Sequence, residues 1–301
     1  MLWYFGSIKK HFLKILIVGG KSSLGIALKE VLGNTHEVIT AGRFGCDIAM
    51  DLANPLQSII IPFNTDVVIH AAASFGGKTP EQIIECESVN VLGTAKLCNA
   101  ALQAKTRHFI FISSIFTLLP VQSDFYNIYA ISKKQAEELA SYFCALFSIP
   151  LTILRPSQIY GSTENFRKHQ PFFYSIIDKA ERNEDIMLYG NHDALRNYIY
   201  IDDLVEIISL IIQKGVEGVY SCAHPENISY STIAKSSISA FESKSQVFFL
   251  KDKPNMPDNV FEWDSSIYDK IDFIPRVNIL EGMRMIRTER ERHLTKAGTN
   301  R

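Results

Sequence analysis

A tyrosine and a lysine in the segment YAISK, Tyr129 and Lys133, have the types and the spacing that proton-transfer chemistry needs. Residues four apart on a helix share a face, so both side chains can point into one site. A phenol has an ordinary pKa near ~10, and a nearby ammonium group, together with a positively charged ring bound beside it, stabilises the phenolate and lowers that pKa. Tyr129 could then exchange a proton with a substrate hydroxyl or carbonyl oxygen at neutral pH.

Two serines, Ser113 and Ser114, end an apolar run (HFIFIS, residues 108–113) that is typical of a buried strand. Sites in open α/β folds form at the carboxyl ends of the strands. Ser114 could donate a hydrogen bond to a substrate oxygen there. Alone, such residues are common in turns and on helix surfaces, so the surrounding elements must decide whether they form a site.

Apolar runs and amphipathic stretches alternate along the first half of the chain. Strands are predicted at 13–19, 37–40, 66–70, 108–113 and 150–154, and helices follow the first turn and cover 80–104 and 128–147. Alternating strands and helices predict a doubly wound parallel sheet, with right-handed crossovers. The expected fold class is α/β, a Rossmann sheet with a smaller C-terminal α/β substrate lobe.

The chain therefore divides into two predicted parts. We expect a dinucleotide-binding Rossmann domain at residues 13–161, with 197–222 returning to it. Residues 162–196 and 223–287 would form the substrate-binding lobe. The segment 288–301 is charged and polar, and we predict a disordered tail there.

The turn after the first strand reads GGKSSLG, from Gly19 to Gly25. A dinucleotide pyrophosphate rests on a helix N-terminus at this position, where small residues let backbone N–H groups approach. Serine occupies position 22, where the common GxxGxxG pattern has glycine. A P-loop is discarded because Ile15 stands where its first glycine belongs. The predicted cofactor contacts here are Gly19, Gly20, Ser22, Ser23, Leu24 and Gly25.

The end of the second strand bears on the choice of cofactor. An acidic residue there would bind the ribose 2′-hydroxyl of NAD, but Ala41 occupies the place and Arg43 follows. An arginine can pair with a 2′-phosphate, so NADP is favoured and NAD stays an option. The alternative is that Arg43 is a solvated loop cation. Asp51 and Leu52 are placed to contact the adenine.

Composition excludes several classes of protein. The net charge of −1 over 301 residues argues against a general nucleic-acid binder. Five cysteines without a CxxC pair, and eight histidines without ligand spacing, predict neither a disulfide framework nor a metal site. We find no signal peptide and no apolar stretch long enough to span a membrane, so a cytoplasmic location is expected.

Taken in order, the motifs resemble those of the extended short-chain dehydrogenase/reductase superfamily, in its branch of NAD(P)-dependent sugar-nucleotide epimerases, dehydratases and reductases. The resemblance covers about residues 13–287. The motifs are GGKSSLG, HAAAS (70–74), NVLGTAKL (90–97), FISS (111–114), YAISK, LRPSQIYG (154–161), LYGNHDALRNYIYIDDLVE (188–206) and DFIPRVNILEGM (272–283).

This resemblance implies roles for individual residues. It makes Ser114, Tyr129 and Lys133 the catalytic set. On the cofactor side, the nicotinamide ribose would be lined by Ala71, Ala72 and Ala73. Asn90 would have a structural and cofactor-side role. The nicotinamide itself would be flanked by Pro156, Ser157 and Ile159. Ser74, Asn165 and Arg196 would bind a nucleotide-sugar substrate. The alternatives are a loop amide for Asn165 and a surface salt bridge for Arg196. A homodimer through helices that include the Tyr/Lys helix is also expected.

Departures from the family pattern narrow the reaction. Dehydratases often carry Asp-Glu after the catalytic Ser or Thr, but Ile115-Phe116 follow Ser114 here and cannot transfer protons. Ile115 also replaces the cysteine of GDP-fucose synthase, and His169 is better explained as an exposed loop residue than as that enzyme's histidine. Asn197-Tyr198 replace the usual Asp-Phe, and Thr117-Leu118 the usual Val-Tyr.

Two kinds of enzyme remain after these exclusions. An NADPH-dependent 4-keto-sugar reductase is favoured, and an NAD-dependent nucleotide-sugar 4-epimerase is the alternative, since both need only hydride transfer and the Ser/Tyr/Lys set. A non-catalytic NADP-binding sensor or scaffold ranks lower, because such relatives typically lack Tyr or Lys and this chain has both.

Overall fold

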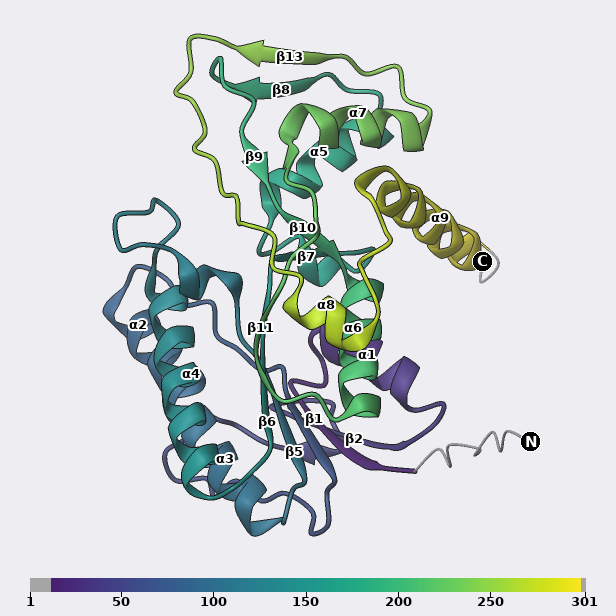
Figure 1. Cartoon of the computed structure of the whole chain (residues 1–301). Helices are drawn as coiled ribbons and strands as arrows, with labels where there is room; N and C mark the ends of the chain where they lie inside the picture. The colour runs from purple at the N-terminus through teal and green to yellow at the C-terminus, as the bar shows by residue number, and fades with distance from the viewer. Residues whose placement is uncertain (1–11, 299–301) are drawn as a thin grey trace, which may run out of the picture.

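A seven-stranded parallel sheet forms the centre of the larger part of the molecule (Figure 1). The computed structural model describes residues 12–298. The strand order is β11-β6-β5-β4-β1-β2-β3. The bounds are β1 Lys14–Val18, β2 Glu37–Gly42, β3 Ile48–Ala49, β4 Val67–His70, β5 His108–Ile112, β6 Leu151–Pro156 and β11 Gly218–Cys222. The predicted Rossmann-type α/β fold is confirmed. The prediction that the N-terminal segment is not a signal peptide concerns mostly residues 1–11, which lie outside the described part.

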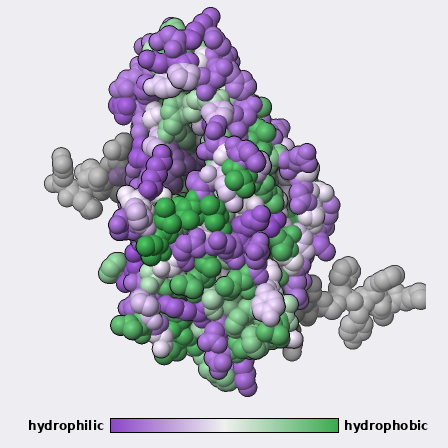
Figure 2. All heavy atoms as spheres, turned by 90° about the vertical axis from the view of Figure 1, so that its left-hand side faces the viewer, coloured by the Kyte–Doolittle hydropathy of each residue, from purple (hydrophilic) through white to green (hydrophobic). Residues whose placement is uncertain are grey.

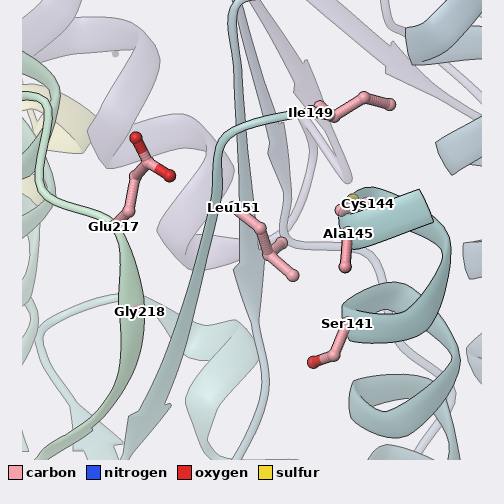
Figure 3. Close-up of a pocket in the computed structure, with 7 residues that line it drawn as sticks. All are labelled: Ser141, Cys144, Ala145, Ile149, Leu151, Glu217 and Gly218. Carbon is pink, nitrogen blue, oxygen red and sulfur yellow. The ribbon is translucent and has the colours of Figure 1, made fainter. Parts of the chain in front are cut away.

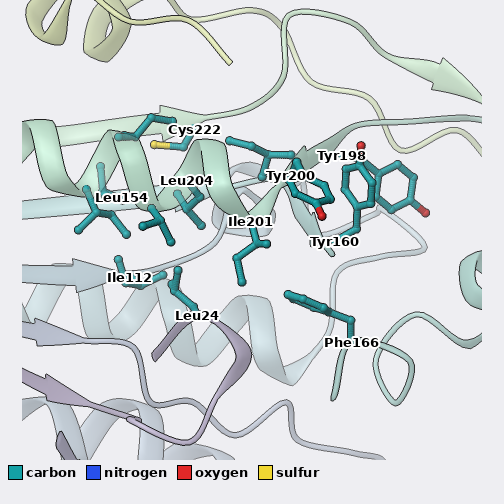
Figure 4. Packing of buried hydrophobic residues seen from close by; sticks show 14 of the residues in the cluster. Leu24, Ile112, Leu154, Tyr160, Phe166, Tyr198, Tyr200, Ile201, Leu204 and Cys222 are labelled. Atoms are coloured by element: carbon teal, nitrogen blue, oxygen red, sulfur yellow. The ribbon is translucent and has the colours of Figure 1, made fainter. Parts of the chain in front are cut away.

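Helices cover both faces of this sheet, which explains why its strands are apolar without alternation. In β1, Ile15 and Ile17 face a core shared with α1 (Ser23–Leu32) and α6 (Ile201–Lys214). Leu16 and Val18 face a second core beneath α3 (Gly93–Gln103) and α4 (Ile128–Leu146). Figure 4 shows the first core, where Leu24, Ile112, Leu154 and Leu204 meet.

The helix predicted over residues 80–104 is interrupted. It consists of α2 (Pro80–Glu87), a π-helical turn η1 (Ser88–Leu92) and α3. Thr79 caps α2, because its side chain accepts from the Gln82 N–H while the Gln82 side chain accepts from the Thr79 N–H. Such π-turns inside α-helices are frequent at functional sites, and this one carries Asn90.

The smaller lobe follows β6 and is built from short elements. Three two-stranded sheets join β7 (Gln158–Tyr160) to β10 (Tyr198–Tyr200), β9 (Leu195–Arg196) to β12 (Ile228–Ser229), and β8 (Ile186–Tyr189) to β13 (Val247–Leu250). The helices are α5 (Pro171–Glu181), α7 (Tyr230–Phe241), α8 (Ser266–Ile271) and α9 (Ile279–Gly298). In Figure 1 this lobe stands above the carboxyl edge of the large sheet.

The prediction of a disordered tail from residue 288 is wrong for the described part, because α9 continues to Gly298. Its charged residues find partners on α5. Arg290 pairs with Asp178 at 3.0 Å and with Glu181. Arg287 bonds Glu291 one turn further along the helix. The high charge that suggested disorder therefore serves inter-helix ion pairs, which composition alone does not reveal.

The structure bears on the cysteines, on membrane-spanning helices and on metal sites within the described residues. All five cysteines are free thiols; Cys86, Cys98, Cys144 and Cys222 are buried, and Cys46 is partly exposed. No described helix combines the length and apolar character needed to cross a bilayer. Among residues 12–298, no group of His, Cys, Asp and Glu side chains is arranged to hold a metal ion.

Candidate active site

The turn after β1 lies at the carboxyl ends of the neighbouring strands β1 and β4. The strand order reverses direction between these two strands, which makes this the topological switch point of the sheet. The N–H groups of Gly19 and Gly20 both donate to the Ala41 carbonyl, at 2.8 and 3.1 Å. Gly19 has a φ of +93°, and a Cβ there would come within 2.9 Å of the backbone of Ala71 and Ala72. Only glycine permits this close approach of two chain segments.

The structure shows why serine can occupy position 22, where the common pattern has glycine. It is the N-cap of α1: its Oγ accepts from the Gly25 N–H at 3.0 Å and donates to the Gly19 carbonyl at 2.7 Å. Its φ of −68° is ordinary, so no glycine is needed. The amides of Ser23 and Leu24, which precede the first intrahelical bonds, are left to face an anion. The turn therefore fits a dinucleotide pyrophosphate.

Other predicted cofactor residues surround this turn. Arg43 directly follows β2, is largely exposed, and contacts Glu85 only loosely, at 3.9 Å. Asp51 accepts from the Ala53 N–H, and Leu52 packs where a side chain on Gly93 would clash. Near the ends of β5 and β6, the buried hydroxyls of Ser113 and Ser157 have no protein partner. These orphaned groups fit a bound cofactor or substrate, and the assigned cofactor contacts stay predictions.

The structure brings Ser114, Tyr129 and Lys133 together. Ser114 ends the segment after β5 and caps the short helix η2 (Ile115–Leu118), its Oγ accepting from the Phe116 N–H at 3.2 Å. Tyr129 lies in the first turn of α4, within hydrogen-bonding reach of Ser114. Lys133 is 2% exposed and donates from Nζ to the Ile112 carbonyl at 2.8 Å.

Burial dominates the electrostatics of these groups. It raises the pKa of Tyr129 to about 12, although the hydrogen bond from Ser114 acts in the opposite direction. Burial lowers the pKa of Lys133 from an ordinary 10.5 to about 7, and the carboxylate of Glu137 limits this fall. The sequence led us to expect a phenol acidified by its lysine together with the positive charge of a bound nicotinamide, and this expectation stays a prediction. At neutral pH the phenol of Tyr129 is protonated.

A buried ion pair that sequence reasoning missed supports the catalytic residues. Glu137, one turn beyond Lys133, binds the Arg155 guanidinium at 2.5–3.1 Å. Thr117 donates from its hydroxyl to the Ser114 carbonyl at 2.9 Å and lies 3.3 Å from the Glu137 carboxylate. The network ties α4 to β6 and to the segment carrying Ser114. Its sequence signal was the position of Glu137, eight residues after Tyr129 on the same helix face.

Asn90 fixes the loop between β4 and α2. Its amide oxygen accepts from the Ser74 N–H, and its amide nitrogen donates to the Ser74 carbonyl, both at 2.8 Å. The same nitrogen lies 2.9 Å from the Ser132 hydroxyl and 3.3 Å from the Cys86 sulfur. The structural role predicted for Asn90 thus has a clear basis, while its cofactor-side role stays a prediction.

On the substrate side, Arg196 is 3% exposed, so the alternative of a surface salt bridge is wrong. Its guanidinium lies between the rings of Phe125 and Tyr230, 5.1 and 4.8 Å from their centroids. It donates to the carbonyls of Leu195 and Pro257. Among the described residues no carboxylate forms an ion pair with it, although the charge of Arg196 helps to lower the pKa of the nearby Asp258 carboxyl.

The other polar residues near the predicted substrate side differ in how far they are buried. Asn165 is exposed in the short helix η3 (Glu164–Phe166). Asn197, which replaces the family's aspartate, binds the backbone of His224 through both atoms of its amide, at 2.8 and 3.0 Å. This role needs no charge, which accounts for the replacement. Sequence reasoning missed Gln158, whose buried amide oxygen has no partner in the protein.

His169 is exposed, as expected, but its ring is packed. It stacks on Phe75 at a centroid distance of 3.8 Å, and Phe75 also stacks on Tyr129, at 4.9 Å. Partial burial and the neighbouring Lys168 lower the pKa of His169. An aromatic stack therefore connects the smaller lobe with the catalytic tyrosine.

A groove of about 370 Å³ lies elsewhere, between the end of α4 and the beginnings of β6 and β11 (Figure 3). Leu151 and Gly218 lie at the amino ends of their strands, whereas Ser114 follows the carboxyl end of β5. The groove is therefore at the opposite edge of the sheet and does not belong to the candidate active site.

The model of the protein family described as "NAD dependent epimerase/dehydratase family" matches residues 15–223. The chain belongs to this family. Its members are NAD(P)-dependent enzymes that modify nucleotide sugars. The match covers the sheet, the phosphate-binding turn and all three predicted catalytic residues.

Individual relatives differ in the reaction they are named for. A dTDP-D-glucose 4,6-dehydratase from Dictyostelium discoideum is 29% identical over 266 residues, covering 74% of this chain and 61% of the relative, which is less than two thirds of its length. A GDP-6-deoxy-D-talose 4-dehydrogenase from Aggregatibacter actinomycetemcomitans is 27% identical over 226 residues, covering 68% and 72%. The structure of UDP-glucose 4-epimerase from Thermotoga maritima matches with a TM-score of 0.75 at 16% identity, covering 93% of this chain and 99% of the epimerase.

Replacing Lys133 with methionine should flatten the pH dependence of stability. The Lys133 pKa is about 7 in the folded protein and ordinary, 10.5, when exposed, so between these values the unfolded chain binds more protons. Wild-type stability should rise with pH there, by up to about 1.4 kcal/mol per pH unit. Urea unfolding at pH 7, 8 and 9 should favour the variant most at pH 7. The exposed neighbour variant Lys134→Met should keep the wild-type slope. Parallel profiles for Lys133→Met and wild type would contradict the assigned burial.

Proposed function

We propose that the chain is an NADP(H)-dependent oxidoreductase that reduces a 4-keto sugar carried by a nucleotide. The observation that carries the proposal is the single proton donor of the site: Tyr129 keeps its proton, Ser114 lies beside it, and apolar side chains follow Ser114. Reducing a ketone needs one hydride and one proton. When bound, the cofactor supplies the hydride.

The residues would divide the work as follows. The Ser114 hydroxyl donates a hydrogen bond to the carbonyl oxygen and fixes its position. Tyr129 donates its phenolic proton to the same oxygen as the carbonyl carbon becomes an alcohol carbon. Lys133, held by the Ile112 carbonyl, stabilises the phenolate that remains. Ile115, which is 1% exposed, and Phe116 offer no second acid or base for the elimination of water, which disfavours a dehydratase despite the sequence similarity to one.

Arg196 supports a substrate with a diphosphate. A buried guanidinium without a carboxylate partner is costly unless an anion completes its environment. Arginine pairs with phosphate oxygens through two hydrogen bonds. With Arg196 on β9 and Tyr129 on α4, the nucleotide would lie on the smaller lobe and the sugar would reach the catalytic hydroxyl.

The alternative is a nucleotide-sugar 4-epimerase, favoured by the fold similarity to UDP-glucose 4-epimerase. An epimerase begins by oxidising the sugar, so its tyrosine accepts a proton first and returns it later. Such an epimerase would retain NAD, and Ala41 in place of an acidic residue at the end of β2 counts against NAD. A sensor without activity is less favoured, since the catalytic set is intact.

Mixing the protein with NADPH and nucleotide-bound 4-keto-6-deoxyhexoses should consume NADPH, measured at 340 nm, and yield the alcohol. Tyr129→Phe should reduce kcat by roughly 10²–10⁴-fold with cofactor binding unchanged. Tyr189→Phe, at an exposed tyrosine on β8, should match wild type. Tightly retained NAD in the purified protein, together with interconversion of two sugar epimers, would overturn the reductase in favour of the epimerase.

For the cofactor, we propose that Arg43 pairs with the 2′-phosphate of NADP. The guanidinium of Arg43 is exposed and only weakly contacts Glu85, so it is free to bind an anion. Position 41, where an acidic residue would bind the ribose of NAD, is alanine. Arg43→Ala should raise KM for NADPH about 10–100-fold, the effect of losing a charge-assisted hydrogen bond, with KM for NADH within about twofold. Arg107→Ala, at the opposite edge of the sheet, is the matched control. An equal increase in KM for NADPH and for NADH would contradict the assignment of Arg43 to the 2′-phosphate.

We also propose a homodimer through the outer faces of α2, η1 and α4. Figure 2 shows apolar side chains gathered on the Rossmann part of this face, beneath a mostly hydrophilic smaller lobe. Ile84, Leu92, Tyr142 and Leu146 are 58–72% exposed there, and exposed apolar patches mark sites of protein–protein interaction. Light scattering should give twice the chain mass, and Leu146→Lys should give the monomer. A monomeric wild type at micromolar concentration would refute the dimer.

A further inference from the structure

A long segment without helix or strand, residues 251–265, crosses the smaller lobe beside Arg196, and we call it the strap. In Figure 1 it descends from β13 to α8. The structure describes all of these residues, and their one regular pairing is the isolated bridge between Asn259 and Arg196. A segment that lacks a ladder of backbone hydrogen bonds must be held in place by side chains.

Two side chains of the strap bind it to the segment that leads into β9. The Oδ1 atom of Asn255 accepts from the N–H groups of Asn191 and His192, at 2.8 and 3.1 Å. The Oδ1 atom of Asp258 accepts from the Leu195 N–H and from Nε2 of His192, both at 2.7 Å. A carboxylate has no proton to donate, so the imidazole carries a proton on Nε2.

The bonds of Asp258 adjoin both of the carbonyl groups that bind Arg196. Nη1 of Arg196 donates to the carbonyls of Leu195 and Pro257, each at 2.7 Å. Asp258 directly follows Pro257 in the chain, and its carboxylate holds the N–H of Leu195. Both acceptors of the guanidinium are therefore fixed at one side chain.

We propose that Asp258, with His192 as its partner, is a positioning residue that aims the Arg196 guanidinium at the diphosphate of the substrate. The inference rests on the proposed function and deepens its substrate site. Two parallel hydrogen bonds from an arginine to phosphate oxygens require a guanidinium of fixed orientation. The rings of Phe125 and Tyr230 lie 5.1 and 4.8 Å from it, and the two carbonyls set its rotation between these rings.

The role of Asp258 follows from its position and not from its charge. The hydrogen bonds from Leu195 and His192 lower the pKa of Asp258, so its carboxyl is ionised at neutral pH. A negative charge near the site would repel a phosphate rather than attract it. Asparagine at position 258 keeps an oxygen that can accept both hydrogen bonds and removes the charge, so this variant separates position from charge.

Calorimetric titration of UDP, GDP, dTDP and CDP into the protein saturated with NADP⁺ measures this site without turnover. For the nucleotide that wild type binds, Asp258→Ala should raise Kd at least about fivefold, the net worth of one hydrogen bond. His192→Ala, which removes one of the two bonds to Asp258, should raise Kd about two- to fivefold. Asp258→Asn should bind no more than about twofold more weakly than wild type. Asp252→Ala, at an exposed aspartate of the same strap, is the matched control and should equal wild type.

A double variant shows whether Asp258 acts through Arg196. Arg196→Lys keeps the charge and loses the planar fork of the guanidinium, so binding weakens but stays measurable. Asp258→Ala added to this variant should weaken binding by less than about twofold, because no fork remains to be aimed. A full further loss in the double variant would overturn the inference. So would an Asp258→Asn variant as weak as Asp258→Ala, or an unchanged Kd in both Asp258→Ala and His192→Ala.

Folding is checked in every variant by circular dichroism and by the Kd for NADP⁺, which should equal that of wild type. Where Asp258→Ala does not fold, His192→Ala carries the same test, because its side chain is half exposed. A general loss of structure would weaken cofactor and nucleotide together, whereas a loss of positioning weakens the nucleotide alone.

The same proteins separate this inference from the proposed function. Weakened nucleotide binding in Asp258→Ala, in a protein that reduces no 4-keto sugar, refutes the reductase and retains the positioning role. Ketone reduction together with an unchanged Kd in both variants refutes the positioning role and leaves the reductase standing. Failure of wild type to bind any of the four nucleotides refutes the diphosphate site and this inference with it.

Discussion

The burial of one amine, that of Lys133, is the constraint around which the site is arranged. An ammonium group deep in a protein is tolerated only where hydrogen bonds and opposite charge compensate for lost water. The Ile112 carbonyl supplies one bond, and the ring of Phe111 lies 4.6 Å from the nitrogen. Glu137 supplies the nearby negative charge. These partners come from β5 and α4, so compensating the amine fixes the helix against the strand that ends beside Ser114.

The same constraint extends into the second layer of side chains. Glu137 is itself buried, and Arg155 neutralises it from β6. Behind Phe111, the ring of His70 stacks at 5.2 Å, and burial together with Lys133 keeps the pKa of this histidine well below its ordinary range. His70 therefore stays neutral and bonds Thr94 on α3 at 3.0 Å. A charged histidine here would add a second cation to a region that compensates only one.

Much of this arrangement could be predicted from the sequence, because it depends on local patterns. The continuous apolarity of β1 requires a strand buried on both faces, and the spacing of Tyr129 and Lys133 requires a shared helix face. The break at η1 could not be predicted, since the amphipathic pattern of 80–104 does not distinguish a π-turn from a regular helix. Arg196 was placed on the substrate side through resemblance, while its burial between two rings depends on Phe125 and Tyr230, 71 and 34 residues away in the sequence.

The least predictable feature was the protonation of Tyr129, and it changes how the reaction must be viewed. From sequence, the nearby lysine and the positive charge of a bound nicotinamide together suggested an acidified phenol. In the folded protein Lys133 is buried and Tyr129 is partly buried. Desolvation disfavours the charged form of each, so phenol and amine move toward neutrality together. A phenol in this state carries a proton that a ketone oxygen can take, and it cannot act as a base until it ionises. A positive charge bound near the hydroxyl would favour the phenolate, so the protonation of the pair depends on what is bound beside it.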